Sequence, residues 1–411
     1  AAHSFTMGLK EDGSIVGWGL DADGFLEIPE PNEAYVGVSA GFEHTLGLKA
    51  DSTLRAWGDD DASQCNVPPP NNGFLQVSAG DHHGLGLRPG GNIEVWGSDI
   101  YGQDEVPLPN EDYISVRAGG SFSLALRSDS SVAAWGRNQY GQLGVPPPNS
   151  GFIELSASVV HSLGLRSNGS VAAWGNNDHG ECTVPSPNIN FVAVEAGGKH
   201  SLGIKVDGSV VAWGSNEYHQ CNVPQPNSGF IAVAGGYEHS MGLKADGSIV
   251  AWGYNDFRQC NVPPPNTGFV AIAAGYYHSL GLKSDGTIVA WGDVTYNQCA
   301  IPEPNSGFVA ISAARAQSVC LRGDPTTAVL VPGARAAAGL RIVTASPNPF
   351  STSTRIGLEA ARPEIVRLLV HDAEGRVVGA MSSSVVASGT SFLVWDGCGR
   401  DGRRLPSGVY F

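Results

Sequence analysis

Eight of the nine tryptophans in this 411-residue chain recur at an interval of 39 residues. They are Trp18, Trp57, Trp96, Trp135, Trp174, Trp213, Trp252 and Trp291. The residues around them repeat too, because each Trp-Gly pair follows a short polar turn, usually containing glycine, and that turn follows a His-Ser-Leu-Gly-Leu-like run. A period of this length is typical of a tandem array of small modules. One module therefore predicts the fold of most of the chain.

Each module contains three short apolar segments separated by turn residues. In the copy that ends at Trp291, these segments are 269–273, 278–283 and 287–291. Segments of this length, rich in Val, Ile, Phe and Trp and broken by Gly or Asp-Gly, are typical of hairpin strands and too short for helices. Because a small three-stranded sheet cannot bury both faces alone, the copies must stack. The predicted fold is all-β, a propeller in which the sheets close a ring.

The repeated phrases resemble a known family. The run from Ala274 to Gly286, followed by Val289-Ala290-Trp291-Gly292, resembles the RCC1 repeat (regulator of chromosome condensation). The compact unit is similar to the short bacterial repeats of the beta-lactamase inhibitor protein II type. That resemblance implies three-stranded blades and target binding through aromatic residues on loops, without the chromatin role of the eukaryotic namesake.

Eight Trp phrases predict eight blades of 39-residue RCC1-like repeats. The relatives in the resembled family have seven, so seven blades plus an extra unit is the alternative. The array begins in mid-module, and a decayed ninth copy at 314–321 supplies early strands without a third. We therefore expect strands from both ends of the array to close the ring.

Charge argues against a nucleic-acid partner. The chain has a net charge of −15, and residues 331–411 carry nine arginines and six acids, so the first 330 residues carry −18. Such a surface repels phosphate backbones, and the sequence has no Lys/Arg stripe. No apolar run is long enough to span a membrane. We expect neither nucleic-acid binding nor a membrane span.

The repeat pattern stops near residue 323, and a second domain is predicted beyond it. The boundaries we predict are 1–323 for the propeller, 324–340 for a linker and 341–411 for a small Ig-like β-sandwich. The runs at 346–350, 395–397 and 407–411 resemble the FlgD Ig-like domain and the similar C-terminal sorting domain of type IX secretion. This resemblance implies a secreted or surface-attached bacterial protein, so we expect an extracellular or outer-surface location. Family members usually continue past the last motif, so this domain is expected to be truncated at its C-terminus.

The predicted strand directions place two variable loops of every blade on one face, namely the Gly-x-x-His turn and the loop after Trp-Gly. Aromatic side chains in such loops are typical of protein-binding hot spots. The predicted partner-binding residues are Tyr101, Tyr140, His179, Tyr218, Phe257, Tyr296, Tyr237, Tyr276, Tyr277 and Phe42. The earlier blades instead gather acids on this face: Asp21, Asp59, Asp60, Asp61, Asp81, Asp99 and Glu105.

Three alternatives to a protein-binding face remain open. Each ring could pack over its own loop, where Asn or Asp three residues after Trp forms a turn. A Tyr beside Asn in successive blades could stack sugars, which would make the chain a lectin for a surface glycan; unequal loops favour a protein. The chain could also be a structural surface protein.

No residue set outside the repeats predicts catalysis. We therefore expect no enzyme activity, no cofactor and no metal, and we interpret Asp59-Asp60-Asp61 as a solvated loop. The six repeat histidines are expected to pack and hydrogen-bond within their blades, because Phe5 and Phe122 replace them elsewhere; they are residues 44, 83, 161, 200, 239 and 278. His82 is outside this register and has no predicted role.

Five cysteines share one repeat position, eight residues after Trp. At that position other copies have Leu26, Asp104 and Leu143, and the replacement by Leu favours a small packed side chain over a disulfide or a metal ligand. The five are Cys65, Cys182, Cys221, Cys260 and Cys299. Cys320 and Cys398 have no predicted role.

Overall fold

The computed structural model describes residues 5–21 and 24–313 in full. Further along the chain it describes the backbone at 340–346, 354–360, 364–366, 369–371, 377–380, 384–386 and 389–395. The chain divides into two compact units, Ala1–Leu321 and Arg322–Phe411. Within the described residues, all regular elements are strands. This part of the chain therefore contains no long apolar helix that could cross a bilayer.

Eight three-stranded antiparallel sheets, called blades here, make up the first unit. Blades 2 to 8 each use three consecutive strands. Blades 2 to 4 contain β3 (Tyr35–Ala40), β4 (His44–Lys49), β5 (Leu54–Gly58); β6 (Gln76–Ala79), β7 (His83–Leu87), β8 (Ile93–Gly97); and β9 (Tyr113–Ala118), β10 (Phe122–Arg127), β11 (Val132–Gly136). Blades 5 and 6 contain β12 (Phe152–Ala157), β13 (His161–Arg166), β14 (Val171–Gly175); and β15 (Phe191–Ala196), β16 (His200–Lys205), β17 (Val210–Gly214). Blades 7 and 8 contain β18 (Phe230–Gly235), β19 (His239–Lys244), β20 (Ile249–Gly253); and β21 (Phe269–Ala274), β22 (His278–Lys283), β23 (Ile288–Gly292).

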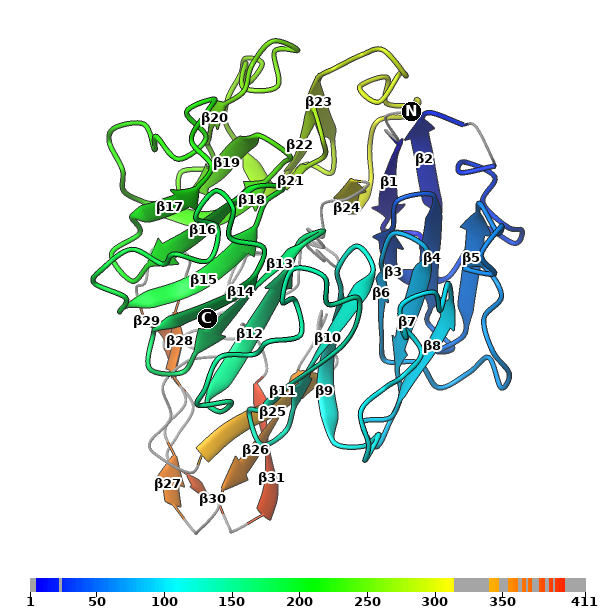
Figure 1. Ribbon diagram of the computed structural model, residues 1–411, viewed down its shortest axis with the longest axis vertical. Helices are drawn as coiled ribbons and strands as arrows, with labels where there is room; N and C mark the ends of the chain where they lie inside the picture. The colour runs from blue at the N-terminus through cyan, green and yellow to red at the C-terminus, as the bar shows by residue number, and fades with distance from the viewer. Residues whose placement is uncertain are drawn as a thin grey trace. The chain divides into compact units, whose positions relative to one another are not determined.

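Blade 1 closes the ring with strands from both ends of the array. It contains β1 (Phe5–Lys10), β2 (Ile15–Gly19) and β24 (Phe308–Ala313), in the order β2-β1-β24. The first strands of neighbouring blades lie side by side, and β24 lies between β21 and β3. Figure 1 shows the yellow β24 beside the blue β1, with the blades arranged around a centre. The eight-bladed prediction and the predicted closure are confirmed, and the seven-bladed alternative is wrong.

The turn between the second and third strands sets the register of each blade. In blade 7 the Asp246 carboxylate accepts hydrogen bonds from the backbone N–H of Ser248 at 2.9 Å and from its hydroxyl at 2.6 Å. Gly247 has φ 77°, a left-handed conformation that favours glycine. This turn pairs Leu243 with Ile249 and so places the apolar faces of both strands together.

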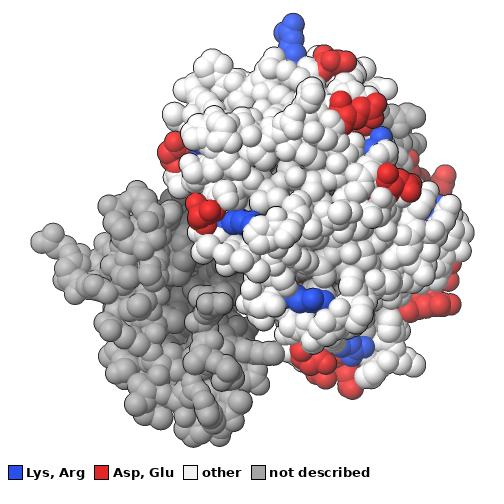
Figure 2. Space-filling model, turned by 60° about the vertical axis from the view of Figure 1, so that its left-hand side comes forward, with Lys and Arg blue, Asp and Glu red and all other residues white. Residues whose placement is uncertain are grey.

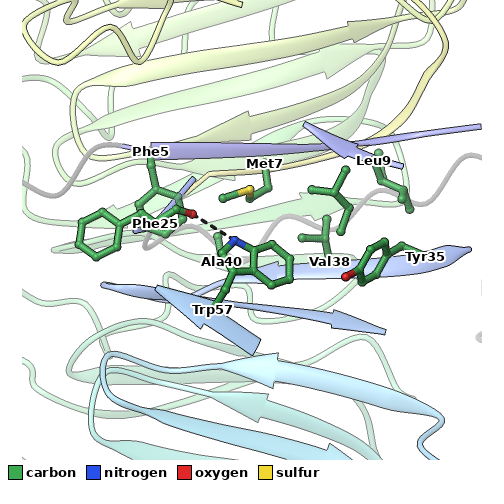
Figure 3. Close-up of a cluster of buried hydrophobic side chains, with 10 residues drawn as sticks. Phe5, Met7, Leu9, Phe25, Tyr35, Val38, Ala40 and Trp57 are labelled. Carbon is green, nitrogen blue, oxygen red and sulfur yellow. Dashed lines mark hydrogen bonds between the residues drawn. The ribbon is translucent and has the colours of Figure 1, made fainter. Parts of the chain in front are cut away.

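The hydrophobic core lies between neighbouring blades rather than inside any one of them. Between blades 1 and 2, Phe5, Met7 and Leu9 of β1 pack with Val38 and Tyr35 of β3 (Figure 3). The side chains of a strand point toward the blades on either side, so each blade buries its apolar surface only when its neighbours are present. The ring is therefore one cooperative core.

The repeated tryptophans join the blades by hydrogen bonds. The indole N–H of Trp57 donates to the backbone carbonyl of Phe25, in the loop that leaves blade 1, at 3.1 Å (Figure 3). The same bond occurs at the other seven junctions, 2.7–2.9 Å long. At the closing junction it joins Trp18 to the carbonyl of Gln298. This role explains why the sequence keeps Trp at each repeat.

An aromatic side chain lies at the start of the first strand of each blade, or two residues before it in blade 3, and its ring contacts the tryptophan of the same blade in six blades. In blade 7, Phe230 meets Trp252 edge-on, with ring centroids 6.4 Å apart. The Lys244 ammonium lies 4.9 Å from the Phe230 centroid on the other side, a cation–π contact. The equivalent Lys or Arg and aromatic ring occur in all eight blades.

All six repeat histidines are buried, and five of them form hydrogen bonds to the neighbouring blade, so the expected role within a single blade is wrong. Nε2 of His83 lies 3.0 Å from the hydroxyl of Ser123, one blade further on, and His278 lies 3.1 Å from the hydroxyl of Thr6 at the closing junction. The same pairing involves His161, His200 and His239. Burial lowers the pKa of these histidines to about 3 or 4, so they are neutral at physiological pH.

The five repeat cysteines are free and packed, as predicted. Each thiol donates a weak hydrogen bond to the backbone carbonyl six residues earlier, with S···O distances of 3.1–3.3 Å. Burial raises their pKa to about 11 or 12, which keeps them as thiols. Cys320 and Cys398 lie outside the described residues.

The second unit contains further antiparallel strands. One sheet has the order β25 (Leu340–Ser346), β26 (Thr354–Ala360), β31 (Gly389–Trp395). Two hairpin-like pairs are β27 (Glu364–Val366) with β30 (Ser384–Val386), and β28 (Leu369–His371) with β29 (Val377–Ala380). Residues 347–353 and 396–411 are outside the described part of the chain, and with them most of the Ig-like motifs. Residues 324–339 of the predicted linker are also outside the described part of the chain.

Candidate binding face

The Gly-x-x-His turns and the loops after Trp-Gly lie at the same end of each of blades 2 to 8. In blade 2, the backbone N–H of Asp59, just after β5, donates to the carbonyl of Glu43 in the turn between β3 and β4, at 2.8 Å. The same bond joins Ser98 to His82, Ser215 to Lys199, and Tyr254 to Glu238, at 2.8–2.9 Å. We call this end of the ring, formed by these turns and loops, the binding face.

Side-chain hydrogen bonds hold each loop on this face in one conformation. In the loop after β20, Asn255 accepts the N–H of Cys260 at 2.9 Å, and Gln259 accepts the N–H of Phe257 at 3.1 Å. Equivalent acceptors hold other loops, namely Asp60, Asp99, Asn138, Asn177 and Asn216. The aromatic side chains therefore stand on a preformed backbone, which lowers the entropy cost of binding.

Four predicted rings are partly exposed on the loops after Trp-Gly. Their exposed fractions are 46% for Tyr101, 39% for Tyr140, 36% for Tyr218 and 39% for Phe257. His179 is also exposed, and the other predicted residues are half-buried: Tyr296, Tyr237, Tyr276, Tyr277 and Phe42. More than a third of each of the four rings is accessible, so they do more than fill their own loops.

Six rings from blades 6, 7 and 8 form one continuous group. They are Tyr218, Tyr237, Tyr254, Phe257, Tyr276 and Tyr277, and we call them the aromatic cluster. The Tyr254 ring is central, with centroids 4.9 Å from Tyr218, 6.0 Å from Phe257 and 5.8 Å from Tyr277. Tyr237 stacks on Tyr276 at 4.7 Å.

Tyr254 is the functional candidate that sequence reasoning missed. It lies two residues after Trp252, whereas the rings predicted in the loops after Trp-Gly lie at the fifth residue after Trp. The other blades have Leu, Asp, Ser, Arg or Asn at the Tyr254 position, so a lone aromatic residue was the available signal. Its neighbours come from three different blades, which a comparison of single repeat positions does not reveal.

The remaining predicted residues lie apart from this cluster. The Arg137 guanidinium lies between two rings, 4.9 Å from the Tyr101 centroid and 6.0 Å from that of Tyr140. Phe42 contacts His82 edge-on at 5.9 Å. Within the described residues, no ring contact joins His179 or Tyr296 to either group. Five of the ten predicted residues thus belong to the aromatic cluster, and its sixth member, Tyr254, was not predicted.

A charged pair borders the aromatic cluster. The Lys199 ammonium lies 3.1 Å from the Glu238 carboxylate and 5.1 Å from the Tyr237 ring centroid. Burial raises the pKa of Tyr277, and so does the Glu238 charge. Burial also raises the pKa of Tyr254. Both phenols are therefore neutral at physiological pH and can donate hydrogen bonds to a partner.

A hollow adjoins the cluster on its inner side. It is lined by Ser158, Val159, Gly198, Tyr237 and Tyr276, together with small residues at the ends of the first strands. On the view of the described residues in Figure 2, charged side chains lie in small separate groups with wide uncharged areas between them. An apolar side chain of a partner could enter such a hollow beside the rings.

The acidic residues of the earlier blades are partly used by their own loops. The Asp60 and Asp99 carboxylates accept the backbone N–H groups of Cys65 and Asp104. These two acids therefore have the same turn-forming role as asparagine in later blades. This weakens the expectation that the acidic half of the face serves binding as a whole.

Sequence reasoning also missed three charged residues on the innermost strands: Arg117 of β9, Glu154 of β12 and Glu195 of β15. Burial raises the pKa of Glu154 to about 7 and that of Glu195 to about 8. The Arg117 charge opposes both shifts, and Ser156 donates to the Glu195 carboxylate at 3.3 Å. At these strand positions most other blades have Gly, Ala or Ser. A charged residue at a position that is otherwise small was the sequence signal that could have identified them.

Comparison with known families matches the repeats. Six segments match the model described as the regulator of chromosome condensation (RCC1) repeat, at residues 35–64, 113–142, 152–181, 191–220, 230–259 and 269–298. Each match runs from the first strand of a blade into the loop after Trp-Gly. Six of the eight blades therefore match the model of the RCC1 repeat. Comparison with curated proteins gives no match.

Several solved structures are similar. The ectodomain of the receptor kinase CR4 from Physcomitrella patens is 26% identical, with a TM-score of 0.50 over 62% of this chain and 73% of that chain. The ectodomain of the receptor kinase ACR4 from Arabidopsis thaliana is 26% identical, with a TM-score of 0.47 over 63% and 95% of the chains. Yeast RCC1 (Prp20), solved bound to Kap60, is 18% identical, with a TM-score of 0.47 over 74% and 82%.

Proposed function

We propose that this RCC1-repeat propeller binds another protein through its binding face, with the aromatic cluster as the main anchor. The observation that carries this proposal is the continuous contact of six rings at the surface end of three blades. The ring fold does not require these side chains, because other blades have small or polar residues at the same positions, such as Gly198 for Tyr237 and Ser215 for Tyr254.

The composition of the site favours a protein partner over a glycan. Binding hot spots in protein interfaces combine buried aromatic anchors with a polar rim, and Tyr is enriched in them. Here the rings adjoin the Lys199–Glu238 pair and a hollow. The rings also belong to one part of the face, whereas a repeated sugar site would recur from blade to blade. We therefore favour one protein partner.

The proposed location is the outside of a bacterial cell, either secreted or attached to the surface. The resemblance of the C-terminal region to FlgD Ig-like and type IX sorting domains supports this. So does the likeness of the propeller to the ectodomain of a plant receptor kinase. In this proposal the C-terminal domain serves export or surface attachment.

The test is capture with the full chain as bait, followed by measurement of affinity for any partner found. Phe257→Ala should weaken binding by about 2 kcal/mol, roughly 30-fold, since it removes an exposed ring of the cluster. Tyr296→Ala is the matched control, because Tyr296 has the same repeat position on the next blade but lies outside the cluster; it should leave affinity within about twofold.

Capture from secreted and surface fractions should be run beside a glycan array. A saturable protein partner that Phe257→Ala releases would support the proposal. Binding of glycans alone would identify a lectin instead. Equal effects of both substitutions, or no effect of either, would show that the aromatic cluster is not the binding site.

A further inference from the structure

Three possible metal ligands from two neighbouring blades meet on the binding face, away from the aromatic cluster. They are Glu43 in the turn between β3 and β4, Asp59 after β5, and His82 in the turn between β6 and β7. Their ligand atoms all lie within 4.8 Å of one another. Nδ1 of His82 is 3.5 Å from the Glu43 carboxylate.

Backbone hydrogen bonds fix the three residues relative to one another. The N–H of Asp59 donates to the carbonyl of Glu43 at 2.8 Å. The N–H of Phe42 donates to the carbonyl of Gly80 at 3.2 Å, which ties the turn of blade 2 to that of blade 3. The Phe42 ring then packs edge-on against the His82 imidazole. The three ligand-bearing residues thus belong to a preformed part of the fold.

The Asp59 carboxylate is itself held in place. One oxygen accepts the N–H of Asp61 at 3.3 Å, and the other accepts a side-chain N–H of Gln64 at 2.5 Å. Gln64 is buried and also accepts the N–H of Ala62 at 2.8 Å. Hydrogen bonds of this kind commonly orient the carboxylate ligands of protein-bound metals.

The other blades show that the repeat itself does not require these residues. At the same three positions, blades 6 and 7 have Lys199, Ser215 and Glu238. Lys199 and Glu238 form an ion pair there. Blades 7 and 8 have Glu238, Tyr254 and Tyr277, which belong to the aromatic cluster and its rim. In the described repeats, the junction of blades 2 and 3 is the place where one imidazole and two carboxylates occupy all three positions.

We propose that Glu43, Asp59 and His82 bind a divalent transition metal of the zinc class. Imidazole nitrogen with carboxylate oxygen suits Zn²⁺, whereas Ca²⁺ prefers six or more oxygen ligands. Three protein ligands leave a coordination position for water or for a side chain of a partner. His82, exposed by 40%, and Glu43, exposed by 20%, give solvent access to the metal.

The test is titration of the untagged full chain, stripped with chelator, with Zn²⁺ and separately with Ca²⁺. We expect one Zn²⁺ per chain, no Ca²⁺ binding at this site, and a rise in the melting temperature with Zn²⁺. His82→Gln and Asp59→Asn should each weaken Zn²⁺ binding at least about 100-fold, more than the loss typical of residues that merely support ligands. The metal-free melting temperature of His82→Gln should stay unchanged, because the side chain of His82 lies on a surface loop. Asp59→Asn also loses an acceptor for the buried Gln64, so a small fall in its metal-free melting temperature is expected beside the loss of Zn²⁺ affinity.

Glu238→Gln is the matched control, because Glu238 has the repeat position of Glu43 and His82 in another blade. It should leave Zn²⁺ affinity unchanged. Substitution with Co²⁺ should give visible bands without the intense near-ultraviolet charge-transfer bands of thiolate ligands. Absence of Zn²⁺ binding, unchanged binding in His82→Gln, or a thiolate spectrum would each overturn the proposal.

Discussion

At the scale of single residues, the contacts between blades decide which side chains matter for stability. Five of the six buried repeat histidines share a hydrogen bond with a hydroxyl of the next blade, as His161 does with Ser201 at 3.0 Å. The Ser201 hydroxyl also donates to the carbonyl of Glu181 at 2.9 Å. Where Phe122 replaces histidine, the facing Ser162 hydroxyl is buried without a hydrogen-bond partner among the described residues. Two serines at one repeat position thus have different environments.

This contrast predicts different costs for the same substitution. Ser201→Ala should destabilise the chain by about 1–3 kcal/mol, because it leaves a buried imidazole without its partner and removes one of two hydrogen bonds to the Glu181 carbonyl. Ser162→Ala should be neutral or slightly stabilising, because no hydrogen bond is lost. Urea unfolding of the two variants beside the parent measures both values. Equal losses would show that the hydroxyl–histidine contact contributes nothing specific.

The sequence predicted which residue types recur at each repeat position. It did not predict which residues of neighbouring blades contact one another. The Gly-x-x-His histidines were expected to act inside their blades, since Phe can replace them. The strand geometry instead points the side chain at residue 161 toward residue 201, in the next blade. The same reason explains why Tyr254, Glu154 and the Glu43–Asp59–His82 group were missed. Tyr254 and Glu154 have neighbours at other repeat positions on other blades, and Glu43 and Asp59 meet His82 only across a junction between blades.

At the scale of elements, the junction between blades is the repeated unit of stability. Every junction has one indole hydrogen bond, including the closing junction, where Trp18 donates to the carbonyl of Gln298 at 2.9 Å. An internal junction has the equivalent bond from Trp213 to the carbonyl of Glu181 at 2.8 Å. If the ring is closed, the loss of this bond should destabilise the chain at both junctions.

Trp18→Phe and Trp213→Phe provide that comparison. Each keeps an aromatic ring and removes the N–H donor to a buried carbonyl, so each should cost about 1–3 kcal/mol plus some packing. The loss at Trp213 should lie at the lower end, because the Ser201 hydroxyl still donates to the Glu181 carbonyl. Thermal and urea unfolding measure the losses. A negligible effect of Trp18→Phe beside a clear effect of Trp213→Phe would mean that blade 1 is open in solution.

The elements themselves were predictable from the sequence for a physical reason. Strand length, Asp-Gly turns and the Trp period are local features, and they recur often enough to define one module, so the eight blades and their common face followed. The closing pair β1–β24 also followed, because a chain that starts in mid-module leaves an unpaired strand at each end. The sequence did not predict which rings contact one another, because these contacts depend on the distance between loops of neighbouring blades.

At the scale of the whole molecule, buried ionisable groups make stability depend on pH. Six buried histidines have native pKa values of about 3 or 4, below the value of 6.5 in the unfolded chain. The unfolded state therefore binds more protons, and the stability present above pH 6.5 is lost as the pH falls toward these native values. Near pH 5 the loss from six groups is about 8 kcal/mol per pH unit.

The two glutamates of the innermost strands act in the opposite direction. Their native pKa values, about 7 for Glu154 and about 8 for Glu195, exceed the value of 4.5 for the unfolded chain. The native state therefore binds more protons between pH 4.5 and 8, and stability falls as the pH rises through that window, by at most about 3 kcal/mol per pH unit. The histidines dominate below pH 6 and the glutamates above pH 7, so maximal stability is expected near neutral pH.

Urea unfolding of the full chain between pH 4 and pH 9 measures this profile. Glu195→Gln should remove much of the decline between pH 7 and pH 8 and shift the maximum upward, because the amide needs no proton to be neutral. Glu105→Gln, a substitution of an exposed acid on the binding face, is the control and should leave the profile unchanged. The steep loss below pH 6 should persist in both variants, since it comes from the histidines. A profile that stays flat from pH 7 to pH 5 would mean that the histidines that join the blades become protonated without unfolding the ring.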